Sequence, residues 1–232
     1  MMTDIELAGE YKGILGDTLF WNCVSIENAR NGFLWCSINP GEVKGGERFN
    51  DCWENMRDIG RSKYWMTLKR KIGTRLNRFG HIDLFPIHCS DEIDFLSTYR
   101  GKEETPEFKK FVALLKVTQE FIENLCPRLI VYSNASTSYL WGWPKQDWMG
   151  YILEPVLLPF SITSGRISKH SQDSLFRITG INDSKQVIKE IKTTALKDIG
   201  TYILLDNQND NHFQHPEISP EDLDSIIKFL NL

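Results

Sequence analysis

The sequence predicts an α/β domain, a three-layer α/β/α sandwich built around a mainly parallel central sheet. Short β-rich runs alternate with longer segments of helical periodicity, which is typical of parallel βαβ units with right-handed crossovers. Several β-rich runs are almost wholly apolar and end at a turn signal, as strands buried on both faces do. No repeat, low-complexity tract or Gly/Ser-rich linker divides the 232 residues. We therefore expect a single domain, 1–232, with its core at 30–200 and peripheral segments at 1–30 and 206–232.

Seven runs of the sequence are predicted strands. They are rich in β-branched and aromatic residues and are bounded by turn residues. The clearest is an apolar run closed by Asn39, Pro40 and Gly41. The strands are expected at residues 18–26, 32–38, 81–85, 128–133, 155–160, 174–179 and 201–205, the last of which could form a sheet edge.

Three further segments are predicted helices. Thr105 supplies an N-cap, a proline follows it in the first turn, and Pro127 ends the helix. Asp183 is the expected N-cap of a second helix, with Gly200 at its C-terminal end. A third helix is expected to begin after Ser219 on the same grounds.

Composition and charge exclude several classes of protein. Apolar residues make up 41% of the chain and charged residues 25%, which excludes disordered, collagen-like and disulfide-scaffold chains. A formal net charge of −4 excludes a polycationic nucleic-acid coat. No run approaches the ~18 apolar residues of a membrane span, and the N-terminus lacks the apolar region of a secretory signal. Because the five cysteines are scattered and form no CxxC pair, we expect a cytoplasmic protein with reduced thiols and no membrane partner.

The turns that follow the buried strands are the expected functional site. In an open α/β sheet the active crevice lies beyond the carboxyl ends of the strands, so the turns after four predicted strands should meet at one mouth. This mouth would be rich in amide, hydroxyl, imidazole and guanidinium groups and poor in carboxylates. The candidate residues are Asn39, Pro40, Gly41, Asn134, Ser161, Ser164, Arg166 and His170.

Several catalytic motifs are absent from the sequence. It has no GxxxxGK[ST] phosphate loop, no GxGxxG dinucleotide motif and no GxSxG nucleophile elbow. Neither HExxH nor a paired Cys/His spacing supports zinc, so we expect no metal and no cofactor. Cys89, activated by His88 or His170, is an alternative nucleophile, although a small buried thiol at a strand end is the more common arrangement.

Three short motifs occur in order between residues 37 and 142. They are Ser-Ile-Asn-Pro-Gly at 37–41, Phe49 followed by Asn-Asp-Cys-Trp at 50–53, and an apolar run with a small polar turn at 129–142. In order and spacing they resemble motifs of the uracil-DNA glycosylase superfamily, over about residues 30–180. In that superfamily a Gly-Ile/Leu-Asn-Pro-Gly motif ends the first core strand. In its mismatch-specific branches an aromatic residue then stacks on the flipped base, and a helix opens near Asn-x-x-Trp.

The resemblance implies an enzyme that releases a base from DNA. Cleavage of the N-glycosidic bond passes through an oxocarbenium-like sugar, so the enzyme must place a water and stabilise the departing base. The base is first flipped out of the stack and held against an aromatic face. By the resemblance, Asn39 positions the water, Phe49 stacks on the base, and His170 or Ser164 assists its departure. This chemistry requires no metal.

Two departures from the family pattern bear on the expected activity. The second family motif, His-Pro-Ser or Asn-Pro-Ser, is absent after Phe160, so His170 could act only from a longer loop. Uracil-specific members carry an Asn at the end of the strand predicted at 81–85, where this chain continues to Pro86. Because a proline ring cannot read a base edge by hydrogen bonds, we do not expect the protein to be specific for uracil.

A basic segment provides the expected surface for DNA. Eight basic residues and one acidic residue lie between residues 57 and 78, with Tyr64 and Trp65 among them. This pattern suits phosphate contact and base stacking. The alternative is an amphipathic helix with its apolar residues in the core and its charges solvated. The expected nucleic-acid contacts are Lys69, Arg70, Lys71 and Arg75.

These observations leave competing hypotheses of function. The first is a glycosylase that acts on a damaged, deaminated or mismatched base through Asn39, favoured by the motif at 37–41 and by Phe49. The second is a non-catalytic module that binds nucleic acid or nucleotides on the same fold, favoured by the missing His-Pro-Ser motif, Pro86 and the negative net charge. A small-molecule hydrolase built on Cys89 is the third.

Overall fold

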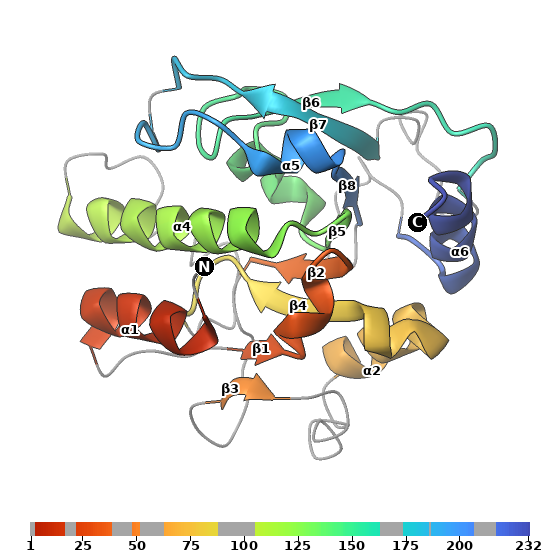
Figure 1. Cartoon of the computed structure of the whole chain (residues 1–232), viewed down its shortest axis with the longest axis horizontal. Coiled ribbons are helices and arrows are strands. Elements are labelled where there is room, and N and C mark those ends of the chain that lie inside the picture. The colour runs from red at the N-terminus through yellow and green to blue at the C-terminus, as the bar shows by residue number, and fades with distance from the viewer. Residues whose placement is uncertain are drawn as a thin grey trace.

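The computed structural model describes residues 3–16, 22–38, 48–51, 63–87, 105–162, 174–185, 187–206 and 217–232. Within these residues, eight strands form one sheet (Figure 1). The strands are β1 (Asn22–Val24), β2 (Phe33–Ser37), β3 (Arg48–Asp51), β4 (Phe79–Asp83), β5 (Leu129–Tyr132), β6 (Tyr151–Pro155), β7 (Leu175–Ile181) and β8 (Tyr202–Leu205). Their order across the sheet is β3-β1-β4-β2-β5-β8-β7-β6.

The centre of the sheet is parallel and its flanks are mixed. Strand β2 pairs in parallel with β4 and β5, and β5 pairs in parallel with β8. Pairing is antiparallel between β1 and β4, between β7 and β8, and between β6 and β7, whereas β1 and β3 are parallel. The predicted α/β class is therefore confirmed, and the parallel arrangement holds for the four central strands.

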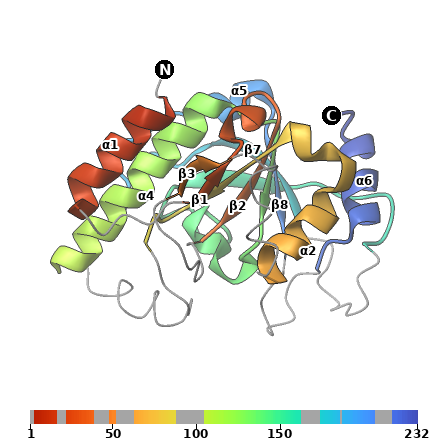
Figure 2. The same ribbon diagram turned by 90° about the horizontal axis from the view of Figure 1, so that it is seen from below.

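Helices cover both faces of the sheet (Figure 2). One face is covered by α1 (Asp4–Leu15), α4 (Pro106–Leu125) and the short α5 (Ala195–Ile199), and the other by α2 (Lys63–Ile72) and α6 (Pro220–Phe229). Three 3₁₀ helices, η2 (Ile26–Ala29), η4 (Gly73–Arg78) and η5 (Ala135–Leu140), lie between strands. Strand β2 shows the alternation between the two cores: Leu34 and Cys36 pack in the core that includes α4, and Phe33 and Trp35 in the core that includes α2. Burial on both faces explains its continuous apolar run.

Side-chain caps fix the ends of the helices. Thr105 Oγ1 accepts a hydrogen bond from the amide of Phe108 at 3.2 Å, as the predicted start of α4 requires. Ser219 and Asp222 form a capping box at the start of α6. Helix α1 is absent from the predicted elements, although Thr3 caps it in the same way.

The helix predicted from Asp183 to Gly200 is wrong over most of its length. Only α5 is helical, and Thr194 is its N-cap. Asn182 Oδ1 accepts a hydrogen bond from the amide of Ser184 at 3.0 Å, which stabilises a turn where the helix was expected to begin. The apolar periodicity of this segment instead reflects isolated contacts, such as that of the buried Ile188, with the core.

The strand predicted at 155–160 is also wrong, since the strand of this region is β6 and ends at Pro155. Residues 156–160 form no regular element. They are apolar because Val156, Leu158 and Phe160 pack against the core beneath α6. Strand β8, which could have formed an edge, lies inside the sheet between β5 and β7.

Candidate functional site at the carboxyl edge of the central strands

A row of buried polar residues crosses the carboxyl ends of the four parallel strands. Asp83 of β4 lies opposite Ser37 of β2. Ser133 follows β5 and Asp206 follows β8, and their amides donate to carbonyls of β2 and β5 at 3.0 and 2.8 Å, which continues the register. Side chains alternate along a strand, so the row faces the α2 side, beyond residues such as Trp35. The row brings polar groups to the edge that sequence reasoning identified.

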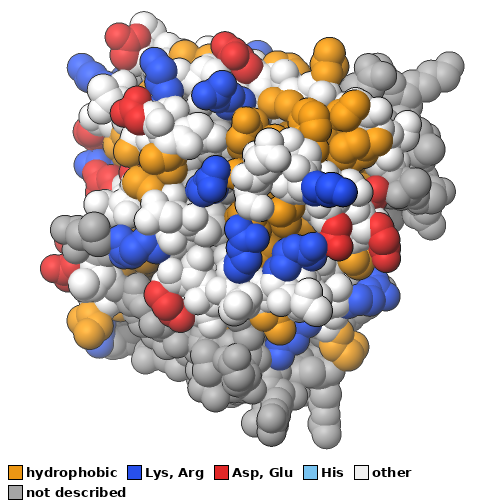
Figure 3. Space-filling view, turned by 45° about the vertical axis from the view of Figure 1, so that its right-hand side comes forward, with side chains coloured by type: hydrophobic (Ala, Val, Ile, Leu, Met, Phe, Trp, Pro, Cys, Tyr) orange, Lys and Arg blue, Asp and Glu red, His pale blue; other side chains and the backbone are white. Residues whose placement is uncertain are grey.

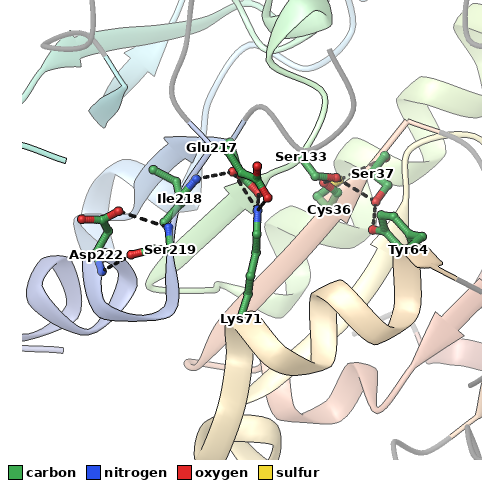
Figure 4. Close-up of polar contacts among 10 residues, drawn as sticks. Cys36, Ser37, Tyr64, Lys71, Ser133, Glu217, Ile218, Ser219 and Asp222 are labelled. Carbon is green, nitrogen blue, oxygen red and sulfur yellow. Dashed lines mark hydrogen bonds and ion pairs between the residues drawn. The ribbon is translucent and has the colours of Figure 1, made fainter. Parts of the chain in front are cut away.

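Hydroxyl and imidazole groups form a hydrogen-bonded cluster around Ser37. Its Oγ lies 3.0 Å from Ser133 Oγ and also bonds to the hydroxyl of Tyr64 (Figure 4). The same Oγ lies 3.3 Å from His81 Nε2. The Tyr64 hydroxyl lies 3.0 Å from His81 Nε2. Burial raises the pKa of Tyr64, and the nearby Asp83 carboxyl adds to that rise. The tyrosine therefore remains a neutral hydroxyl that can donate or accept.

Asp83 is the group of this row whose hydrogen bonding is least satisfied. Its side chain is buried, with 2% of the residue exposed, and its Oδ2 has no hydrogen-bond partner within the described ranges. Burial raises the pKa of Asp83 well above its ordinary value, because removing the carboxylate from water penalises its charge. Burial also raises the pKa of Cys36 on β2, and the nearby Asp83 adds to that rise. The edge thus holds a carboxyl group whose burial favours its neutral form.

Asp206 closes the other end of the row through an ion pair with Lys71 of α2. Lys71 Nζ lies 2.8 Å from Asp206 Oδ2 and 3.5 Å from Glu217 Oε1 (Figure 4). Asp206 Oδ1 also accepts a hydrogen bond from the amide of Ile218, just before α6, at 2.7 Å. This arrangement corrects the expectation that Lys71 contacts nucleic acid: only 2% of the residue is exposed, and its charge is used inside the protein.

Asn134 is the predicted mouth residue whose contacts the structure defines best. Its Oδ1 accepts a hydrogen bond from the amide of Ile38 at 3.0 Å, and 8% of the residue is exposed. This bond fastens the end of β2 to the end of β5 one residue before Asn39. Asn134 therefore holds the strand end that leads into the 37–41 motif.

Of the predicted site residues besides Asn134 and the basic segment, the structure describes only Ser161 and Phe49. Ser161 is exposed, between Phe160 and the buried Ile162, which pack in the core that includes α2 and α6. Phe49 lies in β3, and so does Asn50, so the helix that the resemblance implies does not open at Asn50. The predicted site residues outside the described residues are Asn39, Pro40, Gly41, Ser164, Arg166 and His170, together with His88 and Cys89 of the alternative hydrolase.

The described part of the basic segment, 63–78, forms α2 and η4, and α2 is amphipathic, in agreement with the alternative interpretation. Trp65, Leu68 and Ile72 of α2 are buried in the core. Of the expected nucleic-acid contacts besides Lys71, Arg75 forms an ion pair with Asp224 of α6, Lys69 is half-buried and Arg70 is exposed.

No group of three or more His, Cys, Asp and Glu side chains in the described part of the chain is arranged to hold a metal ion. No helix there is long and apolar enough to cross a bilayer. No protein-family model and no curated protein sequence matches this chain.

Sequence reasoning missed Asp83, His81 and Ser133 as members of the site. A signal for the first two is present in the strand at 81–85, where polar residues occupy alternate positions in an otherwise apolar run. Alternate positions share one face of a strand, so a polar patch on that face could have been predicted.

Proposed function

We propose that the chain hydrolyses the N-glycosidic bond of a damaged, deaminated or mismatched base in DNA, with Asn39 placing the attacking water. The observation that carries the proposal is the hydrogen bond from the amide of Ile38 to Asn134 Oδ1 at 3.0 Å. A side chain that positions water must be held by a rigid backbone, and this bond fixes the backbone immediately before Asn39.

The neighbouring groups can donate hydrogen bonds to a departing base. The hydroxyl groups of Ser37 and Tyr64 and the imidazole of His81 lie in one cluster at the same edge of the sheet. Hydrogen-bond donors of this kind stabilise the negative charge that develops on a base as it departs with the electrons of the broken bond. Phe49 supplies the stacking face, and His170 or Ser164 assists the departure of the base.

A second candidate is a binding module that retains the fold without catalysis. It is favoured by the hydrogen bonds of Ser37 to Tyr64, His81 and Ser133. Because these polar groups bond to one another inside the protein, they are not free to act on a substrate. Such a module would bind nucleic acid or a nucleotide at the same edge and release no base.

Single-turnover base release separates the two candidates. The substrates are single- and double-stranded oligonucleotides that carry uracil, hypoxanthine, xanthine or a mismatched base. The proposal predicts release by the wild type, loss of release in Asn39→Ala and retention in Asn124→Ala, a matched change at an exposed position of α4. Binding without release from any substrate would favour the module, and equal release by both variants would remove Asn39 from the mechanism.

A further inference from the structure

Three arginines lie in a row along the amino edge of the sheet, opposite the candidate site. Arg78 immediately precedes β4, Arg128 immediately precedes β5, and Arg177 lies in β7 opposite Tyr202 of β8. The register pairs form one continuous line: Phe79 with Phe33, Phe33 with Leu129, Leu129 with Tyr202, and Tyr202 with Arg177. Arg177 lies on this line, and Arg78 and Arg128 each lie one residue before it, so the fold brings to one edge of the sheet three arginines that are far apart in the sequence.

The sheet fixes the spacing of this arginine row. Adjacent strands lie about 4.8 Å apart, and two strand steps separate each arginine from the next, so neighbouring backbone positions are about 10 Å apart. The row therefore spans about 20 Å, a length comparable with about six base pairs of duplex DNA at 3.4 Å each.

The three side chains are exposed and available to an anion. The guanidinium of Arg78 lies over the ring of Phe33, 4.3 Å from its centroid, which orients it at the surface. Across the described ranges, none of the three forms an ion pair; the pairs found there involve Lys71, Arg75 and Lys116. Glu154 of β6 lies opposite Arg177 in the register without pairing with it. Lys and Arg side chains also gather near the middle of the face in Figure 3.

We infer that the arginine row binds the phosphate backbone of a nucleic acid. A guanidinium group is permanently charged and offers two parallel donors to a phosphate, and a line of such groups matches a regular line of phosphates. Tyr202, which is half-buried against the core, lies between Arg128 and Arg177 in the sheet. A membrane surface, whose charges are not arranged in a line, fits the row less well. The inference does not depend on the chemistry proposed for the carboxyl edge.

Charge reversal in the full-length protein tests this inference. Arg78→Glu and Arg128→Glu are compared with Lys12→Glu, a matched reversal at an exposed position of α1. Binding of a fluorescent oligonucleotide, single-stranded or duplex, is measured by anisotropy over a range of salt concentrations. Each arginine variant is expected to weaken binding about tenfold at low salt and to lower the slope of log affinity against log salt by about one. Lys12→Glu should leave both unchanged, and Glu154→Gln should strengthen binding.

Circular dichroism and urea unfolding show whether each variant is folded. If Arg78→Glu is unstable, Arg78→Gln replaces it, because glutamine keeps an aliphatic stem over Phe33. Equal affinity of the wild type and the arginine variants overturns the inference. So does arginine-dependent sedimentation with vesicles of phosphatidylcholine and phosphatidylserine by a protein that binds no oligonucleotide. Base release is measured separately, with Asn39→Ala. Loss of the arginine-row proposal therefore does not decide the proposal of base release, and the reverse also holds.

Discussion

Lys71 and Asp206 form a buried ion pair that connects α2 to the end of β8. The two side chains are 3% and 0% exposed, and the distance from Nζ to Oδ2 is 2.8 Å. The carboxylate also accepts a hydrogen bond from the amide of Ile218. One carboxylate thus holds together a helix, a strand end and the segment that begins α6.

Breaking this pair from one side should strongly destabilise the protein. Lys71→Met leaves Asp206 buried without its cation, and we expect the free energy of unfolding to fall by about 3–5 kcal/mol. Lys71→Met combined with Asp206→Asn should recover most of the loss, since Asn is neutral and still accepts the hydrogen bond from Ile218. Urea unfolding measures all three proteins.

The control for this experiment is the ion pair of Arg75 with Asp224, which is part-exposed on both sides. Arg75→Met should cost less than about 1 kcal/mol, because solvent screens such a pair. Equal losses for Lys71→Met and Arg75→Met would contradict a stabilising role for the buried pair.

The sequence predicts best those elements whose signals are local. The run at 32–38 was recognisable because both of its faces are buried, and α4 and α6 because Thr105 and Ser219 cap them. The helix predicted from Asp183 fails because tertiary contacts can give an irregular segment a similar spacing of apolar residues.

The polar row and the arginine row depend on strand register, which local patterns do not contain. The sequence does not distinguish Lys71 from the other basic residues around it. Its burial depends on Asp206, 135 positions later in the chain. Arg78, Arg128 and Arg177 likewise become neighbours only when the sheet assembles. Sequence reasoning located the carboxyl edge and Asn134, but it could not identify Asp83 and Ser133, which also lie there.

Asp83 should make the stability of the protein depend on pH. Its folded-state pKa is raised by burial, so its contribution is fully present below the unfolded pKa, about 3.9, and is lost as the pH rises towards the folded pKa. Over that interval the free energy of unfolding should fall by at most about 1.4 kcal/mol per pH unit on account of this group. Asp83→Asn should remove this part of the slope in urea unfolding measured from pH 4 upwards.

Glu10→Gln, at an exposed position of α1, is the matched control and should leave the slope unchanged. If the unfolding free energy of Asp83→Asn has the same slope against pH as that of the wild type, Asp83 has the same pKa in the folded and the unfolded protein.

Asn134 should affect both stability and the proposed activity through its bond to Ile38. Asn134→Ala leaves the buried amide of Ile38 without an acceptor and should cost about 1–3 kcal/mol of unfolding free energy. Asn134→Asp keeps an oxygen acceptor and should retain more of that stability. If the bond positions Asn39, base release at saturating substrate should fall further in Asn134→Ala than in Asn134→Asp, at a temperature where both are folded. Equal release rates would show that the bond is only structural.

Tyr64 and Ser37 should be energetically coupled, because their hydroxyl groups bond to each other and both contact His81 Nε2. Tyr64→Phe and Ser37→Ala should each cost about 1–2 kcal/mol, and the double variant should deviate from the sum by more than about 0.5 kcal/mol. Each single change removes the same hydrogen bond, so the second change lowers the free energy of unfolding by less than it does alone. Pairing Tyr64→Phe with Thr105→Ala, which removes the N-cap of α4, should instead give additive losses in urea unfolding. Additivity in both pairs would mean that the hydroxyl cluster contributes no coupling energy and that its members act independently at the carboxyl edge.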